Sequence, residues 1–214
     1  LARFVRQRED VTGEDEALPR FSSEDFDIDL INQALSTDHR SPVEASEFLR
    51  GLVDLDVAVP QPPPADPKVT VAAAILFARD PRAYAAGAAV QLVRRTGVGP
   101  GPGPASAREE AFGPAAYLVE RCLEFIAANT KHYQVVIGSR REVWPEYPTE
   151  VLREAILNAL AHRDYHVRGT TVDITIWDDR IEIHSPGGLP APITIENIRT
   201  EHYSRNRRIM RVLK

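Results

Sequence analysis

The chain has 214 residues, with 26 Lys and Arg against 31 Asp and Glu, which gives a formal net charge of −5. Its hydrophobic fraction of 43% is enough for a sizeable core, so the composition excludes a fully disordered chain and a globally basic nucleic-acid coat protein. The single cysteine, Cys122, excludes an intramolecular disulfide and a cysteine-based zinc site, and it fits a reducing, cytoplasmic compartment.

The two ends of the sequence differ in charge. Residues 1–60 carry six arginines against fourteen acidic residues, whereas residues 199–214 carry six basic residues against one acid, Glu201. A basic end is a candidate for anion or nucleic-acid contact, and a solvated helix face is the alternative. Because the chain starts at Leu1 rather than Met, we expect it to be a piece of a longer protein. No apolar run reaches the roughly 20 residues of a membrane-spanning helix, so no membrane partner is expected.

The first third of the chain contains one predicted helix and one ambiguous segment. Residues 41–44 (Ser-Pro-Val-Glu) predict a helix start, and this helix is expected to end at Gly51, a typical C-terminal cap. Five prolines within residues 60–67 predict a linker or domain boundary. Residues 69–77 are apolar throughout, so both a buried strand and a buried helix fit them.

The middle of the chain predicts a strand at residues 90–93, a short strand at 135–137, and two helices. From Pro114 onward, apolar residues recur at three-and-four spacing, which predicts an amphipathic helix with one buried face. That face consists of Leu118, Val119, Cys122, Phe125 and Ile126. A further helix is expected from near Pro148 to Arg163.

The last third alternates apolar and polar residues over 172–177 and 180–184, which predicts a β-hairpin. A loop follows at residues 185–190, and two more helices are expected at 195–199 and 206–213. The predicted fold is therefore α+β. A mixed or antiparallel sheet is covered on one face by the two long helices, and a small helical connector precedes it.

The most informative segment is the helix that contains Glu154, Asn158 and His162. Their four-residue spacing places a carboxylate, an amide and an imidazole on one helix face, opposite an apolar face. Two interpretations stay open. The row is the solvated side of an ordinary amphipathic helix, or it lines a pocket in which a carboxylate activates water and an amide oxygen holds Mg²⁺ bound to phosphates. The adjacent Arg163 and Asp164 are expected to form structural ion pairs.

Three motif blocks occur in order along this part of the chain. They are R-E-A-x-x-N-A-x-x-H-R-D-Y at residues 153–165, D-R-I-E-I-x-x-P-G-G-L-P at 179–190, and S-R-N at 204–206. Together they resemble the RecG-related, Schlafen AlbA-type family of bacterial regulators. Upstream, Phe-Val-Arg at residues 4–6 resembles the last strand of the AlbA-type module. The resemblance implies that residues 1–60 hold the tail of that module and a helical connector, and that residues 66–214 form the RecG-related domain.

That domain is similar to the ATP-binding fold of gyrase, histidine kinases and MutL, the GHKL fold. The similarity implies that Glu154 is the catalytic residue that orients water, and that Asn158 holds Mg²⁺. His162 and the loop residues Ser185, Gly187 and Gly188 would complete a nucleotide site. However, Ser185 stands where the family has an adenine-reading Asp, and no glycine follows Gly188 to build a flexible lid. ATP with Mg²⁺, and no cofactor at all, both remain open.

Three hypotheses for function follow. We favour a non-enzymatic, homo-oligomeric regulatory and interaction module of a bacterial DNA-binding transcriptional regulator, which reaches DNA through flanking modules. The alternatives are a Mg²⁺-dependent ATPase domain of a helicase-related protein and a ligand-free homodimerisation scaffold. The chain has no G-x-x-x-x-G-K-[ST] loop, so it does not support a helicase motor. The candidate nucleic-acid contacts are Arg205, Arg207, Arg208 and Arg211, and packing of their helix on the domain is the alternative.

Overall fold

The computed structural model describes residues 13–98, 103–189, 193–197, 200 and 203–214. Within them the α-helices are α1 (Ile28–Thr37), α2 (Phe48–Asp54), α3 (Val71–Phe77), α4 (Ala115–Asn129), α5 (Thr149–His162) and α6 (Arg207–Leu213). The strands are β1 (Ala58–Val59), β2 (Lys68–Val69), β3 (Ala89–Arg95), β4 (Ala105–Phe112), β5 (His132–Ile137), β6 (Arg140–Pro145), β7 (Val172–Ile176) and β8 (Ile181–His184). The predicted AlbA-type strand at residues 4–6 lies outside the described residues.

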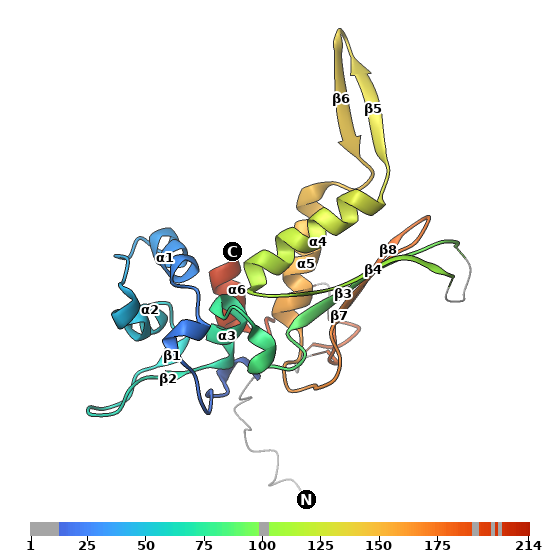
Figure 1. The fold of residues 1–214 in the computed structure, drawn as a ribbon. Helices are drawn as coiled ribbons and strands as arrows, with labels where there is room; N and C mark the ends of the chain where they lie inside the picture. Colours follow the sequence, from blue (N-terminus) through green and yellow to red (C-terminus); the bar gives the residue numbers. More distant parts are fainter. Residues whose placement is uncertain (1–12, 99–102, 190–192, 198–199, 201–202) are drawn as a thin grey trace, which may run out of the picture.

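The central sheet has the strand order β4-β3-β7-β8, and α4 and α5 lie across one of its faces (Figure 1). Strands β3 and β7 are parallel, with Leu92 opposite Ile174, and the other neighbours are antiparallel. The predicted α+β class, with a mixed sheet covered on one face, is confirmed. The predicted hairpin at residues 172–184 is also confirmed as β7 and β8.

One hydrophobic core lies between this sheet and its two helices. The predicted apolar face of α4 is buried, including Cys122, which is fully shielded from solvent. Helix α5 contributes Ile156 and Leu160, which pack in the same core as Leu92 and Ile174 of the sheet. The opposite side of α5, which carries Glu154, is left facing outward.

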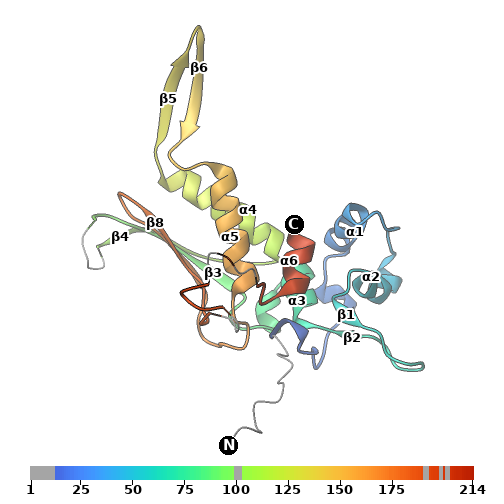
Figure 2. The same ribbon diagram turned by 180° about the vertical axis from the view of Figure 1, so that it is seen from behind.

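A second core joins the N-terminal helices to the C-terminal one. Helices α1, α2 and α3 bury Ile31, Leu52 and Ile75 together with Ile209 of α6, and Figures 1 and 2 show α6 beside α3. This core contains residues from both sides of the proline-rich segment at 60–67. The domain division at this segment stays a prediction.

Three local expectations are corrected or resolved by the structure. The helix expected to start at residues 41–44 and end at Gly51 instead spans Phe48–Asp54 after a 3-10 turn at Ala45–Glu47. A Cβ at Gly51 would lie 3.0 Å from Ile31 and from Val43, so this glycine allows close packing rather than capping the helix. Of the ambiguous apolar segment at 69–77, Val69 ends strand β2 and residues 71–77 form helix α3, which is buried on every side. The predicted helix at 195–199 is wrong for residues 195–197, which form a turn, while residues 198 and 199 lie outside the described residues.

The β5–β6 hairpin projects from the body of the molecule at the ends of α4 and α5 (Figure 1). A two-residue turn with Gly138 at φ +61° connects its strands. The sequence predicted only residues 135–137 of this element. It also predicted no strand at residues 105–112, which form β4. Apolar and polar side chains alternate only weakly there, since the strand lies at the sheet edge.

Candidate functional site

The predicted polar row on α5 forms as expected on the outward face of the helix. The Asn158 side-chain amide donates a 3.0 Å hydrogen bond to Glu154 Oε1. Glu154 is exposed, and Asn158 and His162 are partly buried, so the row is open to solvent at Glu154 and partly covered toward His162. Glu154 and Asn158 thus bring a carboxylate and an amide together on this face, and their oxygen atoms are of the type that a hard cation such as Mg²⁺ prefers.

His162 lies at the end of this row, where α5 meets α6. Burial lowers the pKa of His162, and the positive charges of Arg205 and Lys214 lower it further. The imidazole is therefore neutral at pH 7 and can both donate and accept a hydrogen bond. Among the described residues, no group of three or more His, Cys, Asp or Glu side chains is placed to hold a metal ion.

The C-terminal end of α5 is organised by a buried arginine. Arg163 is 1% exposed, and its guanidinium donates hydrogen bonds to the carbonyls of Asp164, Val167 and Thr170 at 2.6–3.1 Å. Burial lowers its pKa. The structural ion pair predicted for Arg163 is therefore replaced, within the described residues, by bonds to backbone carbonyls. These bonds fold the segment after α5 back toward β7.

The loop after β8 is attached directly to the end of α5. The Ser185 hydroxyl donates a 2.7 Å hydrogen bond to the Ala159 carbonyl, and the Asp164 backbone N–H donates to the Pro186 carbonyl at 2.8 Å. Gly187 has φ +122°, and a Cβ there would lie 2.8 Å from the Cβ of Asp164. The glycine is thus required by both backbone conformation and close approach. Gly188, in contrast, has open space around its Cβ position.

The third motif block locks this loop in place. Arg205 forms a 2.5 Å ion pair with Asp164 and donates to the Gly188 carbonyl at 2.6 Å. The ion pair expected for Asp164 is therefore present. The fully buried Asn206 donates from its side-chain amide to the carbonyls of Ala161 and Arg163. The three motif blocks, separated in sequence, are thus joined in one corner of the fold at the end of α5.

The basic helix α6 is held by acidic residues from the start of the described chain. Both carboxylate oxygens of Glu14 accept hydrogen bonds from backbone N–H groups in the first turn of α6, at Arg208 and Ile209. The Arg208 guanidinium pairs with Asp15 at 2.8 Å and with Asp56 at 2.5 Å. These contacts match the alternative in which the basic helix packs on the domain. They pair a basic residue near the end of the chain with acidic residues among its first 60 residues.

Of the four arginines predicted to contact nucleic acid, three are engaged within the chain. Arg205 holds Asp164, Arg208 holds Asp15 and Asp56, and Arg211 donates to the Leu55 carbonyl. Arg207 is exposed on α6. A nucleic-acid role for Arg205, Arg208 and Arg211 would therefore compete with these intramolecular bonds.

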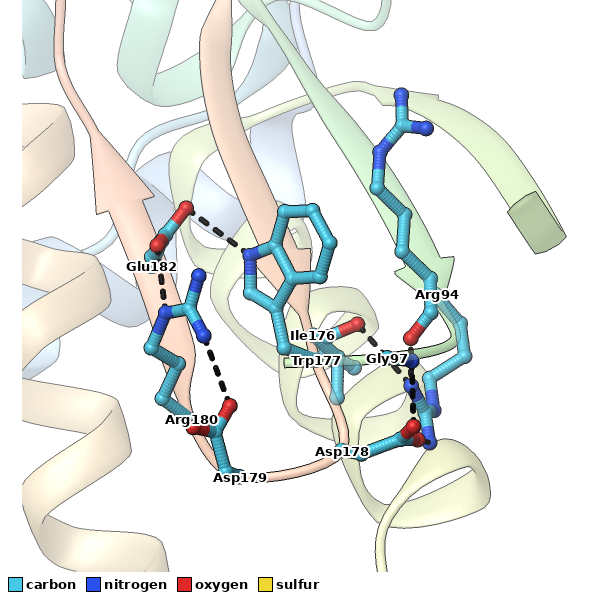
Figure 3. Close-up of polar contacts among 9 residues, drawn as sticks. Arg94, Gly97, Ile176, Trp177, Asp178, Asp179, Arg180 and Glu182 are labelled. Carbon is cyan, nitrogen blue, oxygen red and sulfur yellow. Dashed lines mark hydrogen bonds and ion pairs between the residues drawn. The ribbon is translucent and has the colours of Figure 1, made fainter. Parts of the chain in front are cut away.

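The turn between β7 and β8 contains a second polar cluster, which the sequence did not predict (Figure 3). Asp178 accepts a 2.5 Å bond from Arg94 of β3 and another from the Gly97 backbone N–H. The Trp177 indole and the Arg180 guanidinium both donate to Glu182 at 3.0 and 2.7 Å. These contacts tie the turn to β3 and leave its polar groups occupied. We therefore assign the cluster a structural role.

Two of three comparisons relate the chain to known proteins. Residues 169–214 match a family model described as "Putative ATP-dependent DNA helicase recG C-terminal". The predicted resemblance is thus confirmed over β7, β8, the Ser185–Gly188 loop and α6, while α5 with Glu154 and Asn158 precedes the matched region. No curated protein matches the chain.

A solved structure with a similar fold is the DIP2311 protein from Corynebacterium diphtheriae. It has 22% sequence identity and a TM-score of 0.68, and the match covers 92% of this chain and 38% of that protein. The chain therefore spans well under half of this structural relative. At this level of identity the similarity establishes the fold alone. No helix among the described residues is long and apolar enough to cross a membrane.

Proposed function

We propose that this chain is a regulatory and interaction module of a bacterial DNA-binding transcriptional regulator, built on a RecG C-terminal-type domain whose nucleotide site is degenerate. The observation that carries the proposal is that polar groups of the Ser185–Gly188 loop already form hydrogen bonds within the chain. Its serine hydroxyl is bonded to α5, and Arg205 bonds the Gly188 carbonyl and Asp164.

The loop residues are poorly suited to reading adenine. A carboxylate at position 185 would accept a hydrogen bond from the adenine amino group with full negative charge. The Ser185 hydroxyl is neutral and shorter, and its hydrogen bond to the Ala159 carbonyl holds it against α5. The nearest carboxylate in the motif corner, Asp164, is neutralised by Arg205 at 2.5 Å. The residues present do not fit the adenine end of ATP.

The phosphate end supports a second candidate, Mg²⁺-dependent nucleotide binding. Glu154 and Asn158 present oxygen atoms on the outward face of α5, and their types and spacing suit Mg²⁺ bound to phosphates. If nucleotide binds, these two residues would position the ion and a water molecule. The same module would then be an ATP-binding domain of a helicase-related protein.

DNA contact is assigned to modules outside this chain rather than to α6. Arg208 donates to the carboxylates of Asp15 and Asp56, and Arg211 donates to the Leu55 carbonyl. Release of α6 would therefore break several charge-assisted hydrogen bonds. The role proposed for α6 is to couple the RecG-type domain to the helical unit of α1–α3.

Isothermal titration with a non-hydrolysable ATP analogue and Mg²⁺ distinguishes the candidates. The degenerate-site proposal expects no binding heat at millimolar nucleotide. Micromolar binding that is lost in Asn158→Ala, and retained in the control Gln33→Ala on the exposed face of α1, would overturn it and establish the nucleotide-binding candidate. The scaffold alternative expects no heat and no DNA binding by the full-length protein.

A further inference from the structure

The β5–β6 hairpin stands apart from both hydrophobic cores. Eleven of its twelve strand residues are exposed, and its strands pair only with each other among the described residues (Figure 1). An isolated two-stranded hairpin is marginally stable in water, because it has neither a third strand nor a helix to bury one of its faces. Its extended form therefore calls for a contact that the described part of this chain does not supply.

The hairpin surface is unusually apolar for such a position. The large exposed side chains are Tyr133, Val136, Ile137, Val143 and Trp144, which are 50–65% exposed. They occur on both strands and at both ends of the hairpin. Clustered exposed apolar residues of this kind typically mark an interaction surface.

The charges on β6 differ between the two ends of the strand. Arg140 and Arg141 lie beside the turn, and neither forms an ion pair with any described residue. Glu142 lies in the middle of β6, Glu146 directly follows the opposite end of that strand, and the exposed Glu150 lies in the first turn of α5. At the base, Lys131 before β5 is the one basic residue beside these two acids. Two β6 strands laid antiparallel therefore bring a basic tip next to an acidic end on both sides.

We propose that this hairpin is a dimerisation arm whose partner is the same hairpin of a second copy of this chain. The two β6 edges pair antiparallel about a two-fold axis at Val143. Because Arg140 precedes Val143 by three residues and Glu146 follows it by three, each Arg140 then lies opposite Glu146 of the other copy. The contact is isologous, as in most homodimers.

The choice of β6 over β5 follows from this charge pattern. An antiparallel pair of β5 strands centred on Gln134 would place Lys131 opposite Ile137 and bring no opposite charges together. The β6 pairing also completes a four-stranded ribbon with backbone hydrogen bonds that the free edge lacks. Pro145 donates no bond, so the pairing depends on the side chains as well as on the backbone. The proposal does not depend on whether α5 binds nucleotide.

A charge-reversal experiment tests the arm. Sedimentation equilibrium of the chain is expected to show a dimer, which Arg140→Glu/Arg141→Glu and Glu146→Arg/Glu150→Arg should each weaken at least about tenfold. An equimolar mixture of the two variants restores opposite charges at both ends and should form a heterodimer. The matched control Arg168→Glu/Arg207→Glu changes the net charge by the same amount away from the hairpin and should leave the dimer intact.

Cysteine cross-linking tests the register. Val143 and Val136 are 64% and 65% exposed on the same hairpin, and the native Cys122 is buried. Val143→Cys is expected to form a disulfide-linked dimer under mild oxidation much faster than Val136→Cys. A chain that stays monomeric at about 100 μM, reversal variants that dimerise normally, or equal cross-linking at both positions would overturn the proposal. Loss of DNA binding in the tip variant of a monomeric chain would assign the hairpin to nucleic acid instead.

Discussion

Asn206 and Arg163 are joined by a 2.7 Å hydrogen bond from the side-chain amide of the first to the backbone carbonyl of the second. The same amide also donates to the Ala161 carbonyl at 2.8 Å. The last motif block of the chain thereby supplies donors to backbone carbonyls at the end of α5, and the Ala161 carbonyl also accepts from the Asn206 backbone N–H at 3.3 Å. The corner in which the three motif blocks meet therefore has a structural role that does not depend on ligand binding.

Removal of this amide should destabilise the protein. Asn206→Ala removes the side-chain donor of the Arg163 carbonyl and one of the two donors of the Ala161 carbonyl, so the free energy of unfolding should fall by about 1–3 kcal/mol in urea titrations. Asn158→Ala, on α5, removes a partly exposed amide whose side-chain bond is to the exposed Glu154, and its effect should stay within about 0.5 kcal/mol. Similar losses in the two variants would contradict the capping role of Asn206.

The two adjacent glycines of the motif loop should respond differently to substitution. Gly187→Ala introduces a Cβ at φ +122° that lies 2.8 Å from the Asp164 Cβ, so stability should fall by about 1–3 kcal/mol. Gly188→Ala meets no atom within 4 Å and should have little effect. Thermal unfolding of both variants measures this difference, and a larger loss at Gly188 would show that the loop has a different conformation.

The buried Glu14 carboxylate should make stability depend on pH. Burial raises the pKa of Glu14 above its ordinary 4.5, so the folded protein binds this proton more tightly than the unfolded chain does. Its contribution is present below pH 4.5 and is lost as pH rises through the folded-state pKa.

Comparison with Glu14→Gln isolates this effect. The unfolding free energy of the wild type, minus that of the variant, should decrease as pH is raised from about 4 to about 7. Glu24→Gln, at an exposed position, controls for the loss of one negative charge. A difference that increases with pH would mean that the bonds from Arg208 and Ile209 outweigh burial.

The lone cysteine should be chemically inert in the folded protein. Burial raises the pKa of the Cys122 thiol to about 12, so almost none of it is thiolate near neutral pH. A disulfide reagent at about pH 8 should react with it only after denaturation, while an exposed Val136→Cys thiol should react immediately. Rapid reaction of native Cys122 would indicate that the core between α4 and the sheet opens readily.

The sequence by itself determined the elements whose signals are local. The apolar face of α4, the polar row of α5 and the alternation of β7 and β8 each arise from side-chain periodicity within one element. The spacing of Glu154, Asn158 and His162 therefore predicted one shared helix face, and the structure has that face. The three motif blocks also predicted the family resemblance over the C-terminal part of the chain.

Only the tertiary structure decided which partners these elements have. Residues 71–77 are uniformly apolar, and their pattern alone fits a helix or a strand. In the structure they form a helix that neighbouring elements surround on all sides. Gly51 lies inside α2 rather than at its end, and it leaves room for Ile31 of α1, which a Cβ would approach to 3.0 Å. The parallel pairing of β3 with β7 and the bonds of Arg208 to Asp15 and Asp56 link residues far apart in sequence. Local periodicity carries no information about such partners, since burial of one surface against another selects them only when the whole chain folds.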